Sequence, residues 1–223
     1  MVYDFDYTLV DSSKGVIASM NYALERLGMD VPSPDTIKGT IGLPLAQALD
    51  SVASRAVEEH EYAAFLRHFI ARADEVMAPL THLYPGVIEL VRTLHEHGIR
   101  QGIVSNKLRR RILEILRRES IDSFFEVIVG AEDAPSHKPD PGALLMALER
   151  LECPPERAVY IGDHVVDGQA AAAAGVPFIS VLTGTTTAEQ LHEYWPVAVV
   201  RCVTELLAVL GIEESDAGKA AVG

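Results

Sequence analysis

The sequence predicts an α/β protein with a Rossmann-like, doubly wound parallel sheet and an inserted all-α helical segment. Short apolar runs recur along the chain, and most are continuous rather than alternating with polar residues. Amphipathic segments of about 10 to 15 residues lie between these runs. One long stretch, residues 14–79, shows helical periodicity without a convincing strand. With 48% hydrophobic and 23% charged residues, the chain has the composition of a folded globular protein.

The apolar runs are the expected strands. A continuous apolar strand is buried on both faces, as in a parallel sheet that helices cover on either side. These runs occupy residues 1–5, 99–104, 125–129, 158–161, 178–182 and 197–200. We therefore expect all six to enter one sheet.

The expected helices of this sheet lie between the strands. Amphipathic periodicity covers residues 87–97, 108–119, 141–151 and 169–174. Gly98 and Gly175 follow two of these segments, and glycine after the last turn is a common helix stop. Strands that alternate with helices of this length predict right-handed βαβ units.

A helical insertion interrupts that alternation. Helical periodicity runs through residues 16–27, 43–57 and 59–76, and the turn-forming residues 83–86 mark a second hinge. We expect an α/β core of residues 1–13 and 82–223 and a helical domain of residues 14–81. Such boundaries carry a margin of about two to four residues.

The charge of the chain excludes several partners. Its 223 residues include 19 Lys and Arg against 32 Asp and Glu, a formal charge of −13. Nucleic acids and membrane surfaces are anionic, so neither is an expected partner. A basic run from Lys107 to Arg118 is interleaved with apolar residues, which predicts an amphipathic helix with a solvated charged face.

The location expected from the sequence is the cytoplasm. Two cysteines, Cys153 and Cys202, are too few for a disulfide framework, and no apolar run is long enough to span a membrane. The amino terminus lacks the pattern of a signal peptide. Residues 211–223, rich in Gly, Ala and acidic side chains, are expected to be a frayed tail.

Polar residues follow several of the expected strands where each ends. Because the carboxyl ends of parallel strands meet at one edge of the sheet, these side chains should converge in the crevice where such folds bind ligands. They are Asp4, Asp6, Ser105, Asn106, Lys138, Asp163 and Asp167.

This set of residues suits phosphate chemistry. Carboxylates, here Asp4, Asp6 and Asp163, are the oxygen ligands that Mg²⁺ prefers. Lysine, a hydroxyl group and the amides at a helix start provide what a phosphate dianion needs. The chemistry implied is phosphoryl transfer to a carboxylate.

Four segments in order resemble the motifs of the haloacid dehalogenase superfamily. They are residues 4–12, 105–107, 138–141 and 162–167. The chain is most similar to the branch that has a helical cap after the first motif, which includes phosphoglycolate phosphatases and β-phosphoglucomutases. By this resemblance the helical domain of residues 14–81 is the cap.

The resemblance implies a role for each motif residue. Asp4 is expected to be the nucleophile that forms an aspartyl-phosphate, and Asp6 the acid that protonates the leaving oxygen and then activates water. An acid at this position favours a phosphatase over a dehalogenase, because halide needs no proton. The phosphate is expected to contact Thr8, Ser105, the Asn106 amide and Lys138.

The resemblance also implies a magnesium cofactor. The expected ligands are a carboxylate oxygen of Asp4, the backbone carbonyl of Asp6, and Asp163. Asp167 is expected to orient Lys138 or a metal-bound water.

Three features depart from the family pattern. Tyr7 stands where glycine is usual, and His164 where a small hydroxyl residue is common. The strand before Asp4 is short, which indicates a trimmed start or another initiation point.

In the cap, residues 36–45 resemble a substrate-facing loop, with Lys38 and Gly42 as candidate specificity residues; the alternative is a plain connector between helices.

The leading functional hypothesis is a magnesium-dependent phosphatase for a small phosphorylated metabolite, most similar to phosphoglycolate phosphatase, acting as a monomer or homodimer. A close alternative is a sugar-phosphate mutase of the same branch, which returns the phosphoryl group to the substrate. More distant alternatives are a phospho-aspartate receiver and a binding module without turnover.

Overall fold

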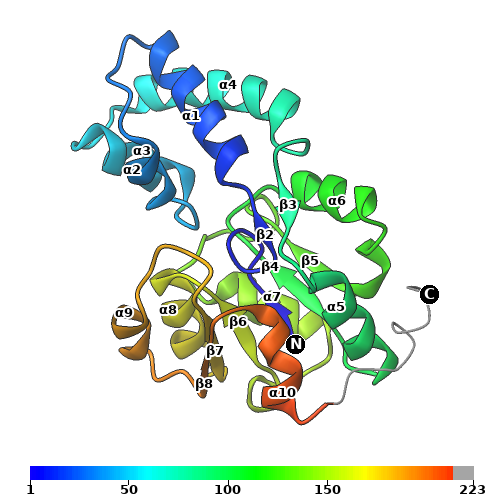
Figure 1. Cartoon of the computed structure of the whole chain (residues 1–223). Helices are drawn as coiled ribbons and strands as arrows, with labels where there is room; N and C mark the ends of the chain where they lie inside the picture. The colour runs from blue at the N-terminus through cyan, green and yellow to red at the C-terminus, as the bar shows by residue number, and fades with distance from the viewer. Residues whose placement is uncertain (213–223) are drawn as a thin grey trace.

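The computed structural model describes residues 1–212 and consists of a sheet with helices on both faces and a helical insertion above one edge (Figure 1). Most of the expected tail, from residue 213 on, lies outside the described residues. Among residues 1–212, no helix is both long and apolar enough to cross a membrane.

The main sheet has six strands in the order β5-β4-β1-β6-β7-β8, and every pair is parallel. All six expected runs contribute a strand, so the predicted parallel sheet is confirmed. The strands are β1 (Val2–Tyr3), β4 (Gly102–Val104), β5 (Val127–Val129), β6 (Tyr160–Gly162), β7 (Phe178–Val181) and β8 (Ala198–Val200).

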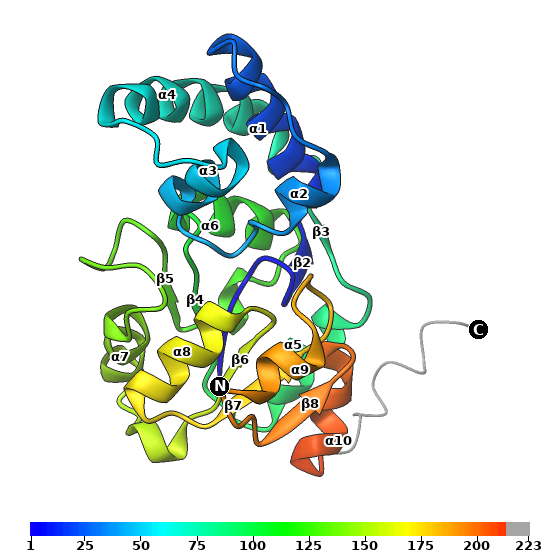
Figure 2. The same ribbon diagram turned by 90° about the vertical axis from the view of Figure 1, so that its left-hand side faces the viewer.

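Successive strand residues pack into different clusters on opposite faces of the sheet. Val2 packs with helices α7, α8 and α9, whereas Tyr3 packs with α5, α6 and α10. Figure 2 shows α8 and α9 in front of the sheet, with α5 and α6 beyond it. These helices are α5 (Val87–Glu96), α6 (Arg109–Arg118), α7 (Gly142–Arg150), α8 (Val165–Ala174), α9 (Ala188–His192) and α10 (Leu206–Leu210). Short 3₁₀ turns lie at Asp122–Phe124, Pro155–Arg157 and Val203–Glu205.

The helical insertion has its own hydrophobic core. Met20, Leu24, Leu49 and Phe65 are at most 1% exposed and pack together, so burial of their apolar surface stabilises this unit independently of the sheet. The helices are α1 (Ser13–Arg26), α2 (Pro34–Lys38), α3 (Leu45–Ala53) and α4 (Glu59–Val76). In Figure 1 they lie above the sheet edge, with α1 beside α4.

A two-stranded antiparallel ribbon joins the insertion to the core. Strand β2 (Val10–Asp11) pairs with β3 (His82–Leu83), and the register places Asp11 opposite His82. The chain therefore enters and leaves the insertion at neighbouring points. The sequence predicted a hinge near residues 83–86 but not this ribbon, because two-residue strands are too short to produce a periodic pattern.

Candidate active site

The carboxyl ends of β1 and β6 place two carboxylates side by side in the middle of the sheet. Asp4 follows β1, and its backbone amide donates to the carbonyl of Ile161 in β6 at 2.8 Å. Asp163 follows β6 directly. The two side chains converge at this edge as expected. Both are buried, with relative exposures of 1% for Asp4 and 2% for Asp163.

Lys138 is the cation of this buried cluster. It comes from the loop after β5, and its Nζ lies 2.8 Å from Asp4 Oδ1 and 2.6 Å from Asp167 Oδ1. Nζ also donates to the Tyr160 hydroxyl at 3.0 Å, so each of its three protons has a partner. Burial lowers the pKa of Lys138, but the charges of Asp167 and Asp4 outweigh it and hold the pKa above its usual range.

The carboxylates of Asp4, Asp163 and Asp167 form a compact acidic cluster. One ligand atom from each lies within 4.8 Å of the others. Burial raises the pKa of Asp4 to about 7 despite the attraction of Lys138, and burial also raises the pKa of Asp163. Asp4 Oδ1 has Lys138 Nζ as an ion-pair partner and accepts no other hydrogen bond within residues 1–212.

This donor set fits a divalent metal ion. Four carboxylates (Asp4, Asp6, Asp163 and Asp167) and two ammonium groups (Lys107 and Lys138) leave a formal charge of −2 at the site. A divalent cation would balance that charge, and hard oxygen atoms are the ligands that such cations prefer.

Small residues make room for the acidic cluster. Thr8 Oγ1 donates to Asp163 Oδ1 at 3.0 Å, which fixes that carboxylate. A Cβ atom on Gly184 would overlap the Asp163 carboxylate, and one on Gly162 would overlap Asp167. Gly184 lies in a loop without a motif, so its sequence context gave no signal of a site residue.

Asp6 is not a member of this three-carboxylate cluster and pairs with Lys107. The Lys107 Nζ lies 2.8 Å from Asp6 Oδ1 and 3.2 Å from Oδ2, and the two side chains are only 7% and 10% exposed. The expected solvated charged face is therefore wrong for Lys107. Its place directly after the polar end of β4, beside Ser105 and Asn106, was the signal for a site residue.

Ser105 and Asn106 follow β4, and the Asn106 side chain connects it to two other segments. Ser105 Oγ accepts from the Lys107 amide at 3.3 Å. The Asn106 side chain accepts from the Lys138 amide at 3.0 Å and donates to the Lys138 carbonyl at 3.3 Å. It also donates to the Gly42 carbonyl of the insertion at 2.9 Å. The Asn106 side chain thus ties together the loop that carries Lys138 and the helical insertion.

The two unusual residues of the motifs occupy defined structural positions. Tyr7 has a φ of 58°, a conformation that suits glycine better than tyrosine, and its side chain is buried. His164 caps α8, because its Nδ1 accepts from the Val166 amide at 3.3 Å. The Asp167 side chain accepts from the His164 amide at 3.0 Å and completes a capping box. The imidazole therefore does the capping that a small hydroxyl side chain can do.

The two candidate specificity residues of the insertion differ in position. Gly42, with a φ of 101°, lies against the core, and a Cβ on it would contact the His164 ring at 3.4 Å. Lys38 does not reach the site: it pairs with Asp35 at 3.0 Å and is 40% exposed. Ile37, the preceding residue, lies on the buried face of α2. Because consecutive side chains on a helix point in different directions, Lys38 lies on another face.

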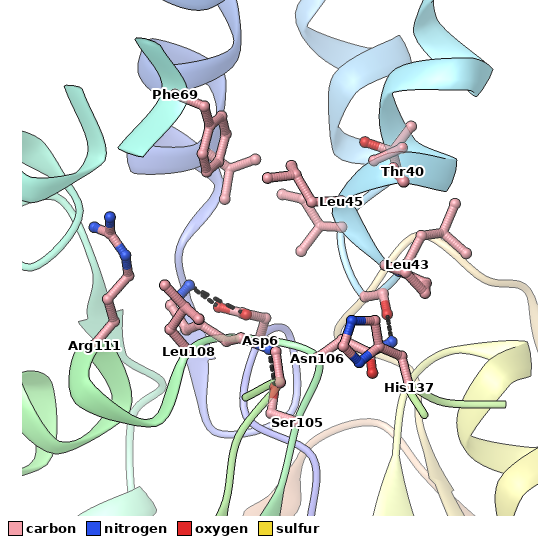
Figure 3. Close-up of a pocket in the computed structure, with 18 of the residues that line it drawn as sticks. Asp6, Thr40, Leu43, Leu45, Phe69, Ser105, Asn106, Leu108, Arg111 and His137 are labelled. Atoms are coloured by element: carbon pink, nitrogen blue, oxygen red, sulfur yellow. Dashed lines mark hydrogen bonds and ion pairs between the residues drawn. The ribbon is translucent and has the colours of Figure 1, made fainter. Parts of the chain in front are cut away.

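A cavity of about 370 Å³ lies between the insertion and the core, directly above Asp6 (Figure 3). The core side of its wall contains Ser105, Asn106 and Lys107, together with the sheet-edge residues Leu108 and His137. Most of the wall on the insertion side is apolar. Its larger members include Met20, Leu43, Leu45, Phe69 and Ile70.

Basic residues of α6 contact the insertion beside this cavity. Arg111 donates to Asp74 at 2.8 Å and is only 4% exposed, and Arg110 reaches the same carboxylate at 2.7 Å. Arg118 donates to the backbone carbonyls of Ala78 and Thr81. Part of the basic run therefore lies against the insertion rather than in solvent.

Comparisons with known proteins agree with this architecture. The family model for haloacid dehalogenase-like hydrolases matches residues 1–181. The chain is 29% identical to a phosphoglycolate phosphatase of Salmonella paratyphi A, over 97% of this chain and 94% of that protein. It is also 29% identical to a protein of Dickeya dadantii named probable phosphatase IndB, over 93% and 91% of the two chains.

Solved structures share the whole fold. A crystal structure from Bacteroides fragilis, assigned to the haloacid dehalogenase-like hydrolases, has 39% sequence identity and a TM-score of 0.89. The match covers 92% of this chain and 97% of that one, so it includes the helical insertion as well as the sheet.

Proposed function

The chain belongs to the haloacid dehalogenase-like hydrolases and is a phosphoric monoester hydrolase, and we propose that it uses magnesium and an aspartyl-phosphate to hydrolyse a small phosphorylated metabolite. The observation that carries this proposal is the buried arrangement of Asp4, Lys138 and Asp167 beside Asp163. An enzymatic assignment disfavours the receiver and the binding module considered from the sequence.

The proposed reaction has two steps. A carboxylate oxygen of Asp4 attacks the phosphorus and forms the aspartyl-phosphate, while the bond from phosphorus to the alcohol oxygen breaks. Asp6 gives its proton to that oxygen, and the alcohol leaves. Asp6 then takes a proton from water, whose oxygen attacks the phosphorus and releases phosphate and free Asp4.

The surrounding residues bind and orient the phosphoryl group in this proposal. The Ser105 hydroxyl and the Asn106 backbone amide would donate to its oxygens, and Thr8 would support the loop through its bond to Asp163. Lys138 would neutralise phosphate charge, with Asp167 holding it in place at 2.6 Å. Preorganised charges of this kind account for large parts of many enzymatic rate enhancements.

Magnesium would be held by Asp4, the Asp6 carbonyl and Asp163. When bound, it supplies positive charge next to the phosphate. Asp167 belongs to the same cluster, and its short contact with Lys138 supports a positioning role over direct ligation.

We also propose that residues 14–81 form the cap domain, which closes over the site and excludes water. The cavity above Asp6 and the contact of Gly42 with His164 support this. Relatives named phosphoglycolate phosphatase make phosphoglycolate the first substrate to test. A monomeric or homodimeric state remains a prediction.

The deciding experiment is a phosphate-release screen with Mg²⁺ over phosphoglycolate, sugar phosphates, nucleotides and pyrophosphate. Asp4→Asn should abolish release, whereas Asp30→Asn, a matched change at an exposed carboxylate, should leave it intact. Undiminished activity in Asp4→Asn would refute the nucleophile assignment. Isomerised sugar phosphate without net phosphate release would favour the mutase instead.

A further inference from the structure

We propose that the alcohol portion of the substrate carries a sizeable apolar body, an aryl or branched alkyl group, that occupies the cavity above Asp6. The inference rests on the proposed phosphatase function and narrows its substrate class.

The position of the cavity identifies which part of the substrate it holds. Asp6 lines the cavity, whereas Asp4 and Lys138 lie beneath it and form no part of its wall. In an in-line displacement the leaving oxygen is opposite the nucleophile and next to the acid that protonates it. A group bonded to that oxygen therefore extends from Asp6 into the cavity.

The lining of the cavity is suited to hydrocarbon. Phe69 and Leu45 from the cap and Leu108 from the core face the same space above Asp6 in Figure 3. Met20 and Ile70 extend this apolar wall. The polar residues of the wall lie mostly on the core side, near Asp6, and Thr40 and Tyr62 are the polar residues on the cap side. An apolar wall with polar groups at one end is typical of pockets that bind an apolar ligand and orient it with hydrogen bonds.

The charges around the cavity disfavour a second anionic group. The Lys and Arg side chains in its described wall are Lys107 and Arg111. Lys107 contacts both oxygens of Asp6, and Arg111 donates to Asp74 and to the carbonyl of Ile70. A carboxylate placed here would lose its hydration without gaining a free cation, and that desolvation is costly.

The size of the cavity also favours a larger substrate than phosphoglycolate. Its volume of about 370 Å³ falls within the range of about 300 to 1,000 Å³ that is typical of pockets for drug-sized ligands. The two-carbon acid of phosphoglycolate would leave most of this volume to water against apolar walls. An aryl or branched alkyl group would displace that water.

The test compares esters that differ only in this body. With Mg²⁺ present, kcat/KM is measured for 2-phenylethyl phosphate, ethyl phosphate and phosphoglycolate, the first two having primary alkanols of similar acidity as leaving groups. We expect kcat/KM for 2-phenylethyl phosphate to exceed both others by about tenfold or more. Equal values for the two alkyl esters, or a preference for phosphoglycolate, would overturn the inference.

Failure of the inference can be distinguished from failure of the proposed function. In one outcome, ethyl phosphate or phosphoglycolate is hydrolysed, Asp4→Asn abolishes that turnover, and the phenyl group does not raise kcat/KM. This outcome supports the proposed phosphatase function and refutes only the apolar subsite. The absence of Asp4-dependent turnover on all three esters and on the wider phosphate panel refutes both.

A variant pair tests the cavity wall itself. Leu45→Gln places an amide in the apolar wall and should lower the ratio of kcat/KM for 2-phenylethyl phosphate over ethyl phosphate at least fivefold. Leu145→Gln makes the same change at an exposed position of α7 and should leave the ratio unchanged. Equal ratios in Leu45→Gln and the parent chain, with both proteins folded by circular dichroism, would refute the subsite.

Discussion

Replacement of Asn106 by alanine should destabilise the protein markedly, because this one side chain joins three segments. It exchanges two hydrogen bonds with the backbone of Lys138 and donates a third to Gly42 in the cap. A typical hydrogen bond contributes about 1 kcal/mol, so the three sum to about 3 kcal/mol. Because the side chain is partly exposed and water can replace some of these bonds, we expect a loss of about 2 kcal/mol in the free energy of unfolding.

Urea denaturation measures this loss. With a slope of about 2 kcal/mol per molar urea, the expected loss lowers the midpoint by about 1 M. Asn21→Ala is the matched control, because Asn21 Oδ1 is buried without a hydrogen-bond partner within residues 1–212, so its removal breaks no such bond and the midpoint should not fall. Fluorescence and circular dichroism must give coincident transitions for the comparison to hold. A shift below about 0.3 M in Asn106→Ala would refute the argument that these bonds stabilise the fold.

Four further predictions concern the site and its surroundings. Lys107→Met should lower kcat at least tenfold in steady-state assays, since Asp6 loses the partner that positions it, and an unchanged kcat would contradict that role. His164→Ala should cost about 1 kcal/mol in urea denaturation by removing the cap of α8, whereas His164→Ser should restore most of it. Lys38→Ala should leave kcat/KM unchanged on every substrate, because Lys38 pairs with Asp35 away from the cavity. Mg²⁺ should raise the melting temperature of the parent chain but much less that of Asp163→Asn; equal shifts would count against Asp163 as a ligand.

The central part of the fold could be predicted from the sequence because its physical causes are local. A continuous apolar run such as residues 158–161 has few alternatives to a buried strand, and polar residues at its end must lie at the sheet edge. The proximity of Asp4, Lys138 and Asp163 follows from topology alone. The sequence therefore predicted the convergence of the acidic cluster with its lysine.

Features that depend on side-chain direction could not be predicted in this way. Lys38 and Lys107 are both lysines next to loop residues, yet one faces solvent and the other lies buried against Asp6. The apolar cavity was also hidden, because Leu45 and Phe69 show the same helical periodicity whether they fill a core or line a pocket. Only the packing of the cap on the sheet distinguishes these cases.

The antiparallel ribbon brings the two ends of the cap together, so the cap is suited to replacement by another domain. Because Asp11 pairs with His82, the two points at which the chain leaves and rejoins the core are adjacent, about 5 Å apart in such a pair. A tight two-residue turn spans that distance, and the cap has its own hydrophobic core. A chain that carries a foreign cap at this junction should therefore acquire that cap's preference for the organic group of the substrate. The four aspartates and two lysines at the sheet edge belong to the core, so the phosphate chemistry should be retained.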